Sequence, residues 1–210
     1  MDRAEELPLL PEEQCGYRRD RGTLDLVTLL QCATDAFREA GKELHVAFVD
    51  LRKAFDSVNR EAMYQVLGKL GVPPLMLQTI KGLHDGMKAQ VSSEGALSDS
   101  FEVRTGVRQG CCLAPILFSL YFAAVINDWK ANIPRDVILK YRLDGNLHRH
   151  FKGGEVPVHQ RTHVDSLNLL DMEFADDLAV LATTADKLDS MVRLLFKCMA
   201  DWGFTMSDKT

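Results

Sequence analysis

Apolar side chains recur every three or four residues in five stretches of the chain, and this spacing predicts helices. Thr23 and Gly41 are residue types that begin and end helices, so we expect them to be the N-cap and the stop of the first one. Gly71 and the Pro73–Pro74 pair are expected to end the second. The expected helices cover residues 23–40, 59–70, 75–83, 115–132 and 185–203.

Shorter apolar runs between these helices predict strands. Residues 44–51 form a β-rich run without polar alternation, so we expect a central strand that is buried on both faces. Residues 1–14 and 135–163 are expected to be irregular, and the second of these stretches is locally basic. This order of elements predicts an α+β fold in which helices pack on an antiparallel sheet. Two hairpins are expected, from residues 88–91 with 101–105 and from residues 169–174 with 178–182.

Composition sets broad limits on the kind of protein. A chain of 210 residues forms one large or two small domains, and 46% hydrophobic residues suffice for a core. The net charge of −5 argues mildly against a nucleic-acid binder, which is usually basic. Five cysteines without a CxxC pair and an acidic start without a signal-peptide core predict a reduced, intracellular protein. No apolar run is long enough to span a bilayer, so we expect no membrane partner.

Three carboxylates at strand ends carry the candidate chemistry. Asp50 ends the run 44–51, and Asp176 with Asp177 lies between two short apolar runs. Two carboxylates about 4 Å apart repel each other by roughly 4 kcal/mol at an effective dielectric constant near 20, and a divalent cation reverses the sign of that energy. Taken alone, Asp50 could cap a helix and the pair could occupy a turn. Their joint occurrence predicts a two-metal site that handles phosphates.

Five segments in order resemble a known family. FVDLRKAFD (48–56), GVRQGCCLAPILFSLY (106–121) and FADD (174–177) resemble motifs A, B and C of reverse transcriptases, in particular those of non-LTR retrotransposons (LINE-type) and group II introns. QCGYRRDRGTLDL (14–26) resembles the segment before motif A, and WGFTMSDKT (202–210) resembles the start of motif D. The resemblance implies a polymerase palm with partial fingers, acting as an RNA-directed DNA polymerase.

The resemblance also implies roles for the acids. Asp50, Asp176 and Asp177 would be catalytic and hold two Mg²⁺ ions, one activating the primer 3′-hydroxyl and the other steadying the triphosphate. Lys209 would be catalytic as the proton donor to pyrophosphate.

Other motif residues would contact the nucleotide. Phe55 would be the steric gate against a ribose 2′-hydroxyl, although simple core packing is an equal alternative. Gln109 and Gly110 would meet the incoming nucleotide and the template. The expected partners are therefore an RNA template, a DNA primer and a dNTP.

The family pattern predicts a division of the chain. Residues 1–43 would be a leader with partial fingers, and residues 44–210 the palm, with a basic insertion at about 135–163. The family's other finger motifs and the thumb would be absent from this chain, and other retroelement domains could supply them. Arg18, Arg19 and Arg21 could meet nucleic-acid phosphate or form a solvated face. The sequence leaves open whether such a protein resides in the cytoplasm or the nucleus.

Three alternatives accompany this interpretation. The first is a catalytically inactive, retroelement-derived nucleic-acid-binding or scaffold protein. The second is a phosphoacceptor receiver domain, which also gathers three acids but places the acid pair before the lone Asp. A third possibility concerns only the basic insertion, where zinc binding competes with a hairpin that touches nucleic acid. The histidines in question are His148, His150, His159 and His163.

Overall fold

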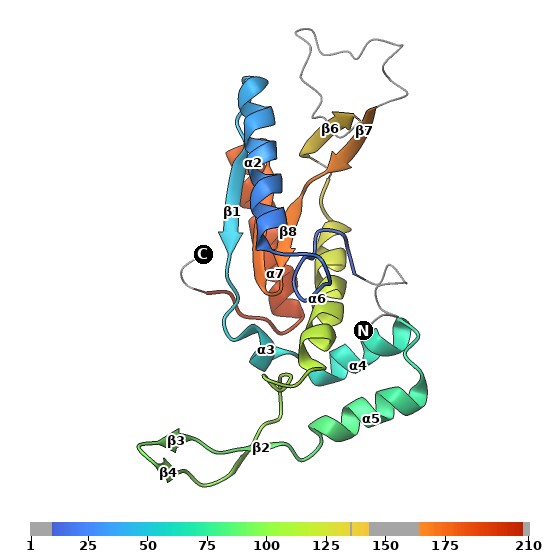
Figure 1. Ribbon diagram of the computed structural model, residues 1–210, viewed down its shortest axis with the longest axis vertical. Helices are drawn as coiled ribbons and strands as arrows, with labels where there is room; N and C mark the ends of the chain where they lie inside the picture. Colours follow the sequence, from blue (N-terminus) through green and yellow to red (C-terminus); the bar gives the residue numbers. More distant parts are fainter. Residues whose placement is uncertain (1–9, 135, 143–163, 208–210) are drawn as a thin grey trace.

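A three-stranded antiparallel sheet forms the centre of the molecule (Figure 1). The computed structural model describes residues 10–134, 136–142 and 164–207. The strand order in the sheet is β1, β9, β8. The strands are β1 (His45–Val49), β8 (Asp171–Phe174) and β9 (Asp177–Ala182).

Helices cover both faces of this sheet, and β9 shows why. Leu178, Val180 and Ala182 point into one core with helices α6 (Ala114–Lys130) and α7 (Ala185–Asp201). Ala179 and Leu181 point into a second core with α2 (Thr23–Glu39). Side chains alternate between the two faces of a strand, so a strand covered on both sides is apolar throughout. Figure 1 shows α2 on one side of the sheet and α7 on the other.

The expected central position of residues 44–51 is wrong. Among the described residues β1 pairs only with β9, and Phe48 is 67% exposed. The central strand is β9. A run of apolar residues predicts a strand, but its position in the sheet and the cover of each face depend on which other segments it meets.

The predicted helices form, with small differences at their ends. Gly22 is the N-cap of α2 instead of Thr23, and its N–H donates to the Asp25 carboxylate at 2.7 Å. An acid three residues into the helix replaces the expected side-chain cap because it binds the cap residue's own N–H. Asn59 caps α4 by accepting from the Ala62 N–H. The remaining helices before α6 are α3 (Ala54–Ser57), α4 (Arg60–Lys69) and α5 (Pro74–His84).

Short ladders account for the rest of the described strands. The hairpin expected between residues 88 and 105 forms an arm that projects from the body (Figure 1). The stretch from 135 is not wholly irregular, because residues from 138 onward form a strand that pairs with β7. Antiparallel pairing with residues 164–168 stabilises the extended backbone of residues 138–142. The short strands are β2 (Lys88–Ala89), β3 (Ser92–Ser93), β4 (Ala96–Leu97), β5 (Phe101–Glu102), β6 (Ile138–Arg142) and β7 (Val164–Asn168).

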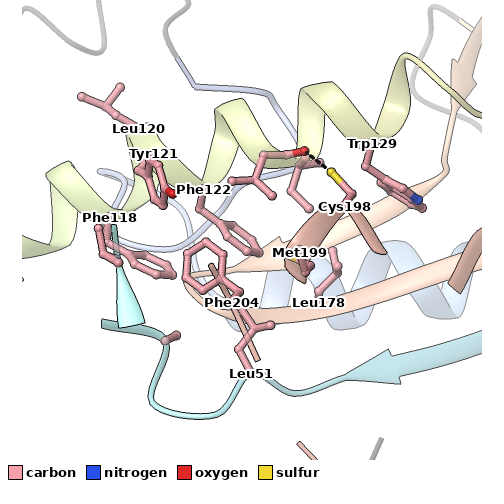
Figure 2. Packing of buried hydrophobic residues seen from close by; sticks show 14 of the residues in the cluster. Leu51, Phe118, Leu120, Tyr121, Phe122, Trp129, Leu178, Cys198, Met199 and Phe204 are labelled. Carbon is pink, nitrogen blue, oxygen red and sulfur yellow. Dashed lines mark hydrogen bonds between the residues drawn. The ribbon is translucent and has the colours of Figure 1, made fainter. Parts of the chain in front are cut away.

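The larger core is built around α6, which is apolar on most sides. Figure 2 shows Phe118, Tyr121 and Phe122 of this helix directed toward Phe204. Phe118 and Phe122 stack at 5.4 Å between ring centroids, and Phe204 meets Phe122 edge-on at 6.0 Å. A helix surrounded by protein is buried on nearly every face. None of the helices in the described part of the chain is long and apolar enough to cross a membrane.

Candidate functional site

The sheet brings the three predicted acids to one end. Val49 of β1 pairs with Leu178 of β9, so the next residues in that register, Asp50 and Asp177, lie opposite each other. Asp176 occupies the tight turn that joins β8 to β9. Acids separated by more than a hundred residues in the sequence are therefore neighbours at one sheet end.

The electrostatics of this sheet end reflect how close the three carboxylates lie to one another. Burial raises the pKa of Asp176, and the negative charges of Asp177 and Asp50 raise it further. Asp50 and Asp177 are exposed. The described residues contain no group of three acid, histidine or cysteine side chains arranged closely enough to hold a metal by themselves. The donors still fit Mg²⁺, which prefers carboxylate oxygens and completes its shell with water and phosphate oxygens.

The start of the chain holds the turn that carries Asp176, which the sequence pattern did not reveal. The Cys15 N–H donates to the Glu173 carbonyl at 2.8 Å, and the Glu173 N–H donates to the Glu13 carbonyl at 3.0 Å. The fully buried Gln14 binds Ala175 at both of its peptide groups. The expectation that residues 1–14 are irregular is therefore wrong at its C-terminal end. Glutamine and glycine alone give no strand signal, because this pairing depends on a distant partner.

Phe55 lies between two aromatic rings. It stacks on Phe118 with centroids 4.4 Å apart and planes 15° from parallel. Tyr17 meets it edge-on at 6.2 Å and remains 48% exposed. Burial raises the pKa of Tyr17, and the charge of Asp176 adds to the rise, so the phenol lies near that acid. Tyr17 is thus a further candidate site residue, which the sequence marked only as part of the family-like segment.

The loop with Gln109 and Gly110 lies beside the same helix as Phe55. The Val107 N–H donates to the Phe55 carbonyl at 2.8 Å. Gln109 Nε2 donates to Asp56 Oδ1 at 3.4 Å, and both side chains are exposed. Gly110 has a φ of +79°, a conformation that glycine adopts without steric cost. The structure therefore brings Gln109 and Gly110 into the neighbourhood of Phe55.

Gly106 brings this loop into close backbone contact with α3. Its N–H donates to the Val58 carbonyl at 2.9 Å, and its own carbonyl accepts from Arg60 Nε at 2.8 Å. A Cβ at this position would lie 2.6 Å from the Cα and carbonyl oxygen of Asp56. Only glycine allows the two backbones to come this close, so Gly106 sets the distance between the loop and α3.

The segment that resembles motif D lies against the strand end that carries Asp50. The Ser207 N–H donates to the Asp50 carbonyl at 2.8 Å, and the Arg52 N–H donates to the Thr205 carbonyl at 2.9 Å. These bonds place the C-terminal segment beside motif A. Lys209 and the four histidines of the insertion lie outside the described residues.

Behind the turn lies a buried ion cluster that the sequence analysis did not anticipate. Asp171 and Glu173 of β8 are fully buried, and Lys130 Nζ lies 2.9 Å and 3.8 Å from their carboxylate oxygens. Glu13 lies 3.6 Å from the same ammonium. Burial raises the pKa of Glu173 well above its ordinary value, and the neighbouring charge of Asp171 raises it further. Acids in a strand-like run gave no sign that a lysine of α6 would meet them.

A cavity of about 380 Å³ opens beside two of the acids. It lies between the first turns of α2 and the sheet, and most of its lining is apolar. Its lining residues are Leu26, Val27, Leu30, Phe48, Val49, Asp50, Met172, Phe174, Asp177, Leu178 and Ala179.

The whole described chain matches a known family. The model of "Reverse transcriptase (RNA-dependent DNA polymerase)" matches residues 1–209. The chain belongs to the reverse transcriptase family. This confirms the resemblance inferred from the motifs.

Curated relatives place the chain near retrotransposon polymerases. A Pol polyprotein of the retrotransposable element R2 from Nasonia vitripennis is 25% identical over 198 residues, which is 94% of this chain and 17% of the relative. The RNA-directed DNA polymerase from the mobile element jockey of Drosophila funebris is 30% identical over 119 residues, covering 56% of this chain and 13% of the relative. The chain thus spans less than a fifth of either relative's length.

Solved structures confirm the predicted fold. The telomerase of Candida albicans, solved in complex with a TWJ fragment of telomeric RNA, matches all of this chain and 32% of its own, with a TM-score of 0.62 and 10% identity. Apo telomerase from Candida tropicalis matches 90% of this chain and 34% of its own, with a TM-score of 0.58 and 13% identity. At such low identity the likeness shows the α+β polymerase fold and no more.

Proposed function

We propose that this chain is the palm, with part of the fingers, of an RNA-directed DNA polymerase that adds nucleotides to a primer 3′-hydroxyl. The observation that carries the proposal is the register of the sheet, which sets Asp50 opposite Asp177 and beside Asp176. Family membership indicates the class of reaction, and the three acids are the residues proposed to carry it out.

Asp50, Asp176 and Asp177 are the residues that would hold two Mg²⁺ ions. The raised pKa of Asp176 supports this, because among the described residues the charged groups that act on its carboxylate are the acids Asp177 and Asp50. When bound, the two cations would lower the pKa of the primer hydroxyl and neutralise the charge on the leaving pyrophosphate. The protein's part is to fix three carboxylates on a rigid sheet end, at the place where the phosphates must lie.

The nucleotide would lie over Phe55. The stack on Phe118 keeps this ring from turning aside, so it can block a ribose 2′-hydroxyl while admitting deoxyribose. Gln109 and Gly110 would approach the base of the incoming dNTP and the RNA template. The apolar cavity beside Asp50 and Asp177 has a suitable surface for the sugar and base of the last nucleotide of the DNA primer.

Two further assignments complete the proposal. Lys209 would donate the proton to pyrophosphate, and its neighbours at 205–207 lie along motif A. Residues 1–43 would form the leader and partial fingers, and residues 44–210 the palm. Residues Gln14 to Gly16 contact the palm turn directly, which supports a close union of the two parts.

A primer-extension assay tests this function. The chain is incubated with Mg²⁺, dNTPs and a DNA primer annealed to an RNA template, and the product length is measured. We expect extension by the wild type and by Asp35→Asn, an exposed acid of α2. We expect a loss of roughly 10²–10³-fold in Asp50→Asn and Asp176→Asn. RNA binding without extension by the wild type would instead support an inactive, retroelement-derived binding protein.

A further inference from the structure

The side chain of Gln14 is fully buried and uses all of its hydrogen-bonding capacity on the catalytic turn and its approach. Its Oε1 accepts from the N–H groups of Gly16 at 2.8 Å and Ala175 at 3.0 Å. Its Nε2 donates to the Ala175 carbonyl at 3.2 Å and to Glu173 Oε2 at 3.1 Å. A glutamine amide has two acceptor sites and two donors, and all four are occupied here.

Ala175 needs such support because its backbone is strained. Its φ is +58°, in the left-handed region that costs a residue with a Cβ roughly 1–2 kcal/mol. Ala175 immediately precedes Asp176, so its conformation sets the direction in which the turn presents both acids. Gln14 bonds to the N–H and the carbonyl of this one residue, and so it restrains the peptide planes on both sides.

Gly16 and Arg18 further restrict the movement of the turn and of Gln14. Gly16 fits so closely that a Cβ there would lie 2.2 Å from the Ala175 nitrogen. Arg18 Nη1 donates to the carbonyls of Pro11 at 3.0 Å and Gln14 at 3.2 Å. These bonds restrain the backbone carbonyl of Gln14.

We propose that Gln14 is a positioning residue for the acids: by gripping Ala175 it fixes the turn in which Asp176 and Asp177 meet Asp50. This inference rests on the proposed function. Gln14 touches neither substrate nor metal, and acts only through the geometry of the turn. Its loss therefore affects cation binding and the rate of the chemical step more than nucleotide binding.

The test compares Gln14→Met with Gln65→Met. Methionine keeps the length and volume of the buried side chain while removing all four bonds, and Gln65 is an exposed glutamine of α4 that serves as a matched control. Three quantities are measured on the full chain: Mn²⁺ affinity by electron paramagnetic resonance, the Mg²⁺ dependence of primer extension, and kcat with the KM for dNTP.

We expect Gln14→Met to bind Mn²⁺ at least tenfold more weakly and to lose at least tenfold in kcat, with less than a threefold change in KM. Gln65→Met should match the wild type in all three. If Gln14→Met does not fold, as judged by circular dichroism, Gln14→Asn takes its place, because it keeps the amide but draws it back from Ala175.

The outcomes separate the two hypotheses. A wild type that binds Mn²⁺ and extends primers, beside a folded Gln14 variant with equal metal affinity and kcat, would overturn the positioning role alone. A wild type that neither binds Mn²⁺ nor extends a primer would refute the proposed function, and the positioning role with it. Equal losses in kcat and dNTP affinity without weaker Mn²⁺ binding would also contradict the positioning role.

Discussion

Phe55 lies face to face with Phe118, at 4.4 Å between ring centroids, so the proposed sugar gate is fastened to the core helix α6. Replacing Phe55 with Val removes the ring and opens space for a 2′-hydroxyl. We expect the ratio of kcat/KM for dNTP over rNTP to fall at least tenfold, which is about 1.4 kcal/mol of discrimination. Single-nucleotide extension with each substrate measures this ratio.

The control for this variant is Phe101→Val. Phe101 is 49% exposed on the projecting hairpin and stacks on no other ring among the described residues. Its loss should leave sugar discrimination unchanged. An unchanged ratio in Phe55→Val would identify Phe55 as a packing residue. Its stack on Phe118 contributes roughly 0.5–1.5 kcal/mol to stability beyond the area that it buries.

Gly16→Ala should be strongly destabilising. The new Cβ would lie 2.2 Å and 2.9 Å from backbone atoms of Ala175, so the turn itself must move. Overpacking of this kind costs typically 1–3 kcal/mol in unfolding free energy, and we expect primer extension to be lost as well. Urea denaturation measures the first effect.

Gly82→Ala is the matched control for that substitution. Gly82 lies on the exposed side of α5, and a Cβ there meets nothing within 4 Å. Alanine in a helix should stabilise the chain by about 0.5–1 kcal/mol. If Gly16→Ala behaved like Gly82→Ala, the close contact between Gly16 and the turn at Ala175 would be disproved.

Glu173 should make the protein less stable as the pH rises. Burial and the charge of Asp171 raise the pKa of Glu173, although Lys130 opposes the rise. Between the ordinary glutamate pKa and this raised value the folded chain keeps a proton that the unfolded chain has released. Stability is therefore highest below that window and falls as the pH passes upward through it.

Glu173→Gln should remove this part of the pH dependence. Glutamine can still accept from Gln14 Nε2, so the turn keeps its bond. Urea midpoints measured between about pH 4 and 8 should fall less in this variant than in the wild type. Glu102→Gln, an exposed acid paired with Arg104, is the control and should follow the wild type. The prediction fails if both variants show the same slope.

Lys130→Met should lower the free energy of unfolding. Lys130 is the cation among Asp171, Glu173 and Glu13, and its removal leaves buried acids without a counter-charge. Breaking a buried ion pair on one side costs about 3–5 kcal/mol. Adding Asp171→Asn to this variant should recover part of the loss. A full loss in the double variant would show that packing, not charge, is responsible.

Mg²⁺ should stabilise the wild type but not Asp176→Asn. The raised pKa of Asp176 means that its ionised form is unfavourable without a cation, so metal-free stability falls as the pH rises above the ordinary aspartate pKa. Removing that charge should raise the melting temperature of the metal-free chain and abolish its increase with Mg²⁺. Differential scanning calorimetry with and without Mg²⁺ checks both. Asp35→Asn should retain the wild-type response.

The sequence by itself determined the helices, the hairpin with the acid pair and the family. These features are local: the helical period, helix stops such as the one at Gly71, and the order of the motifs depend on neighbouring residues. The acids Asp50, Asp176 and Asp177 could be chosen as candidates because charges at the ends of apolar strands need a reason to be there.

Only the tertiary structure decided what holds those acids in place. Three such features are contacts between separate parts of the chain. The central strand is β9 and not β1, Lys130 lies between two buried acids, and Gln14 hydrogen-bonds Ala175. The residues next to Lys130, Gln14 and Ala175 in the sequence do not indicate that these contacts form. A hydrogen bond across 159 residues, such as that from Gln14 to Glu173, depends on how the chain folds back on itself, which the local pattern of residues does not encode.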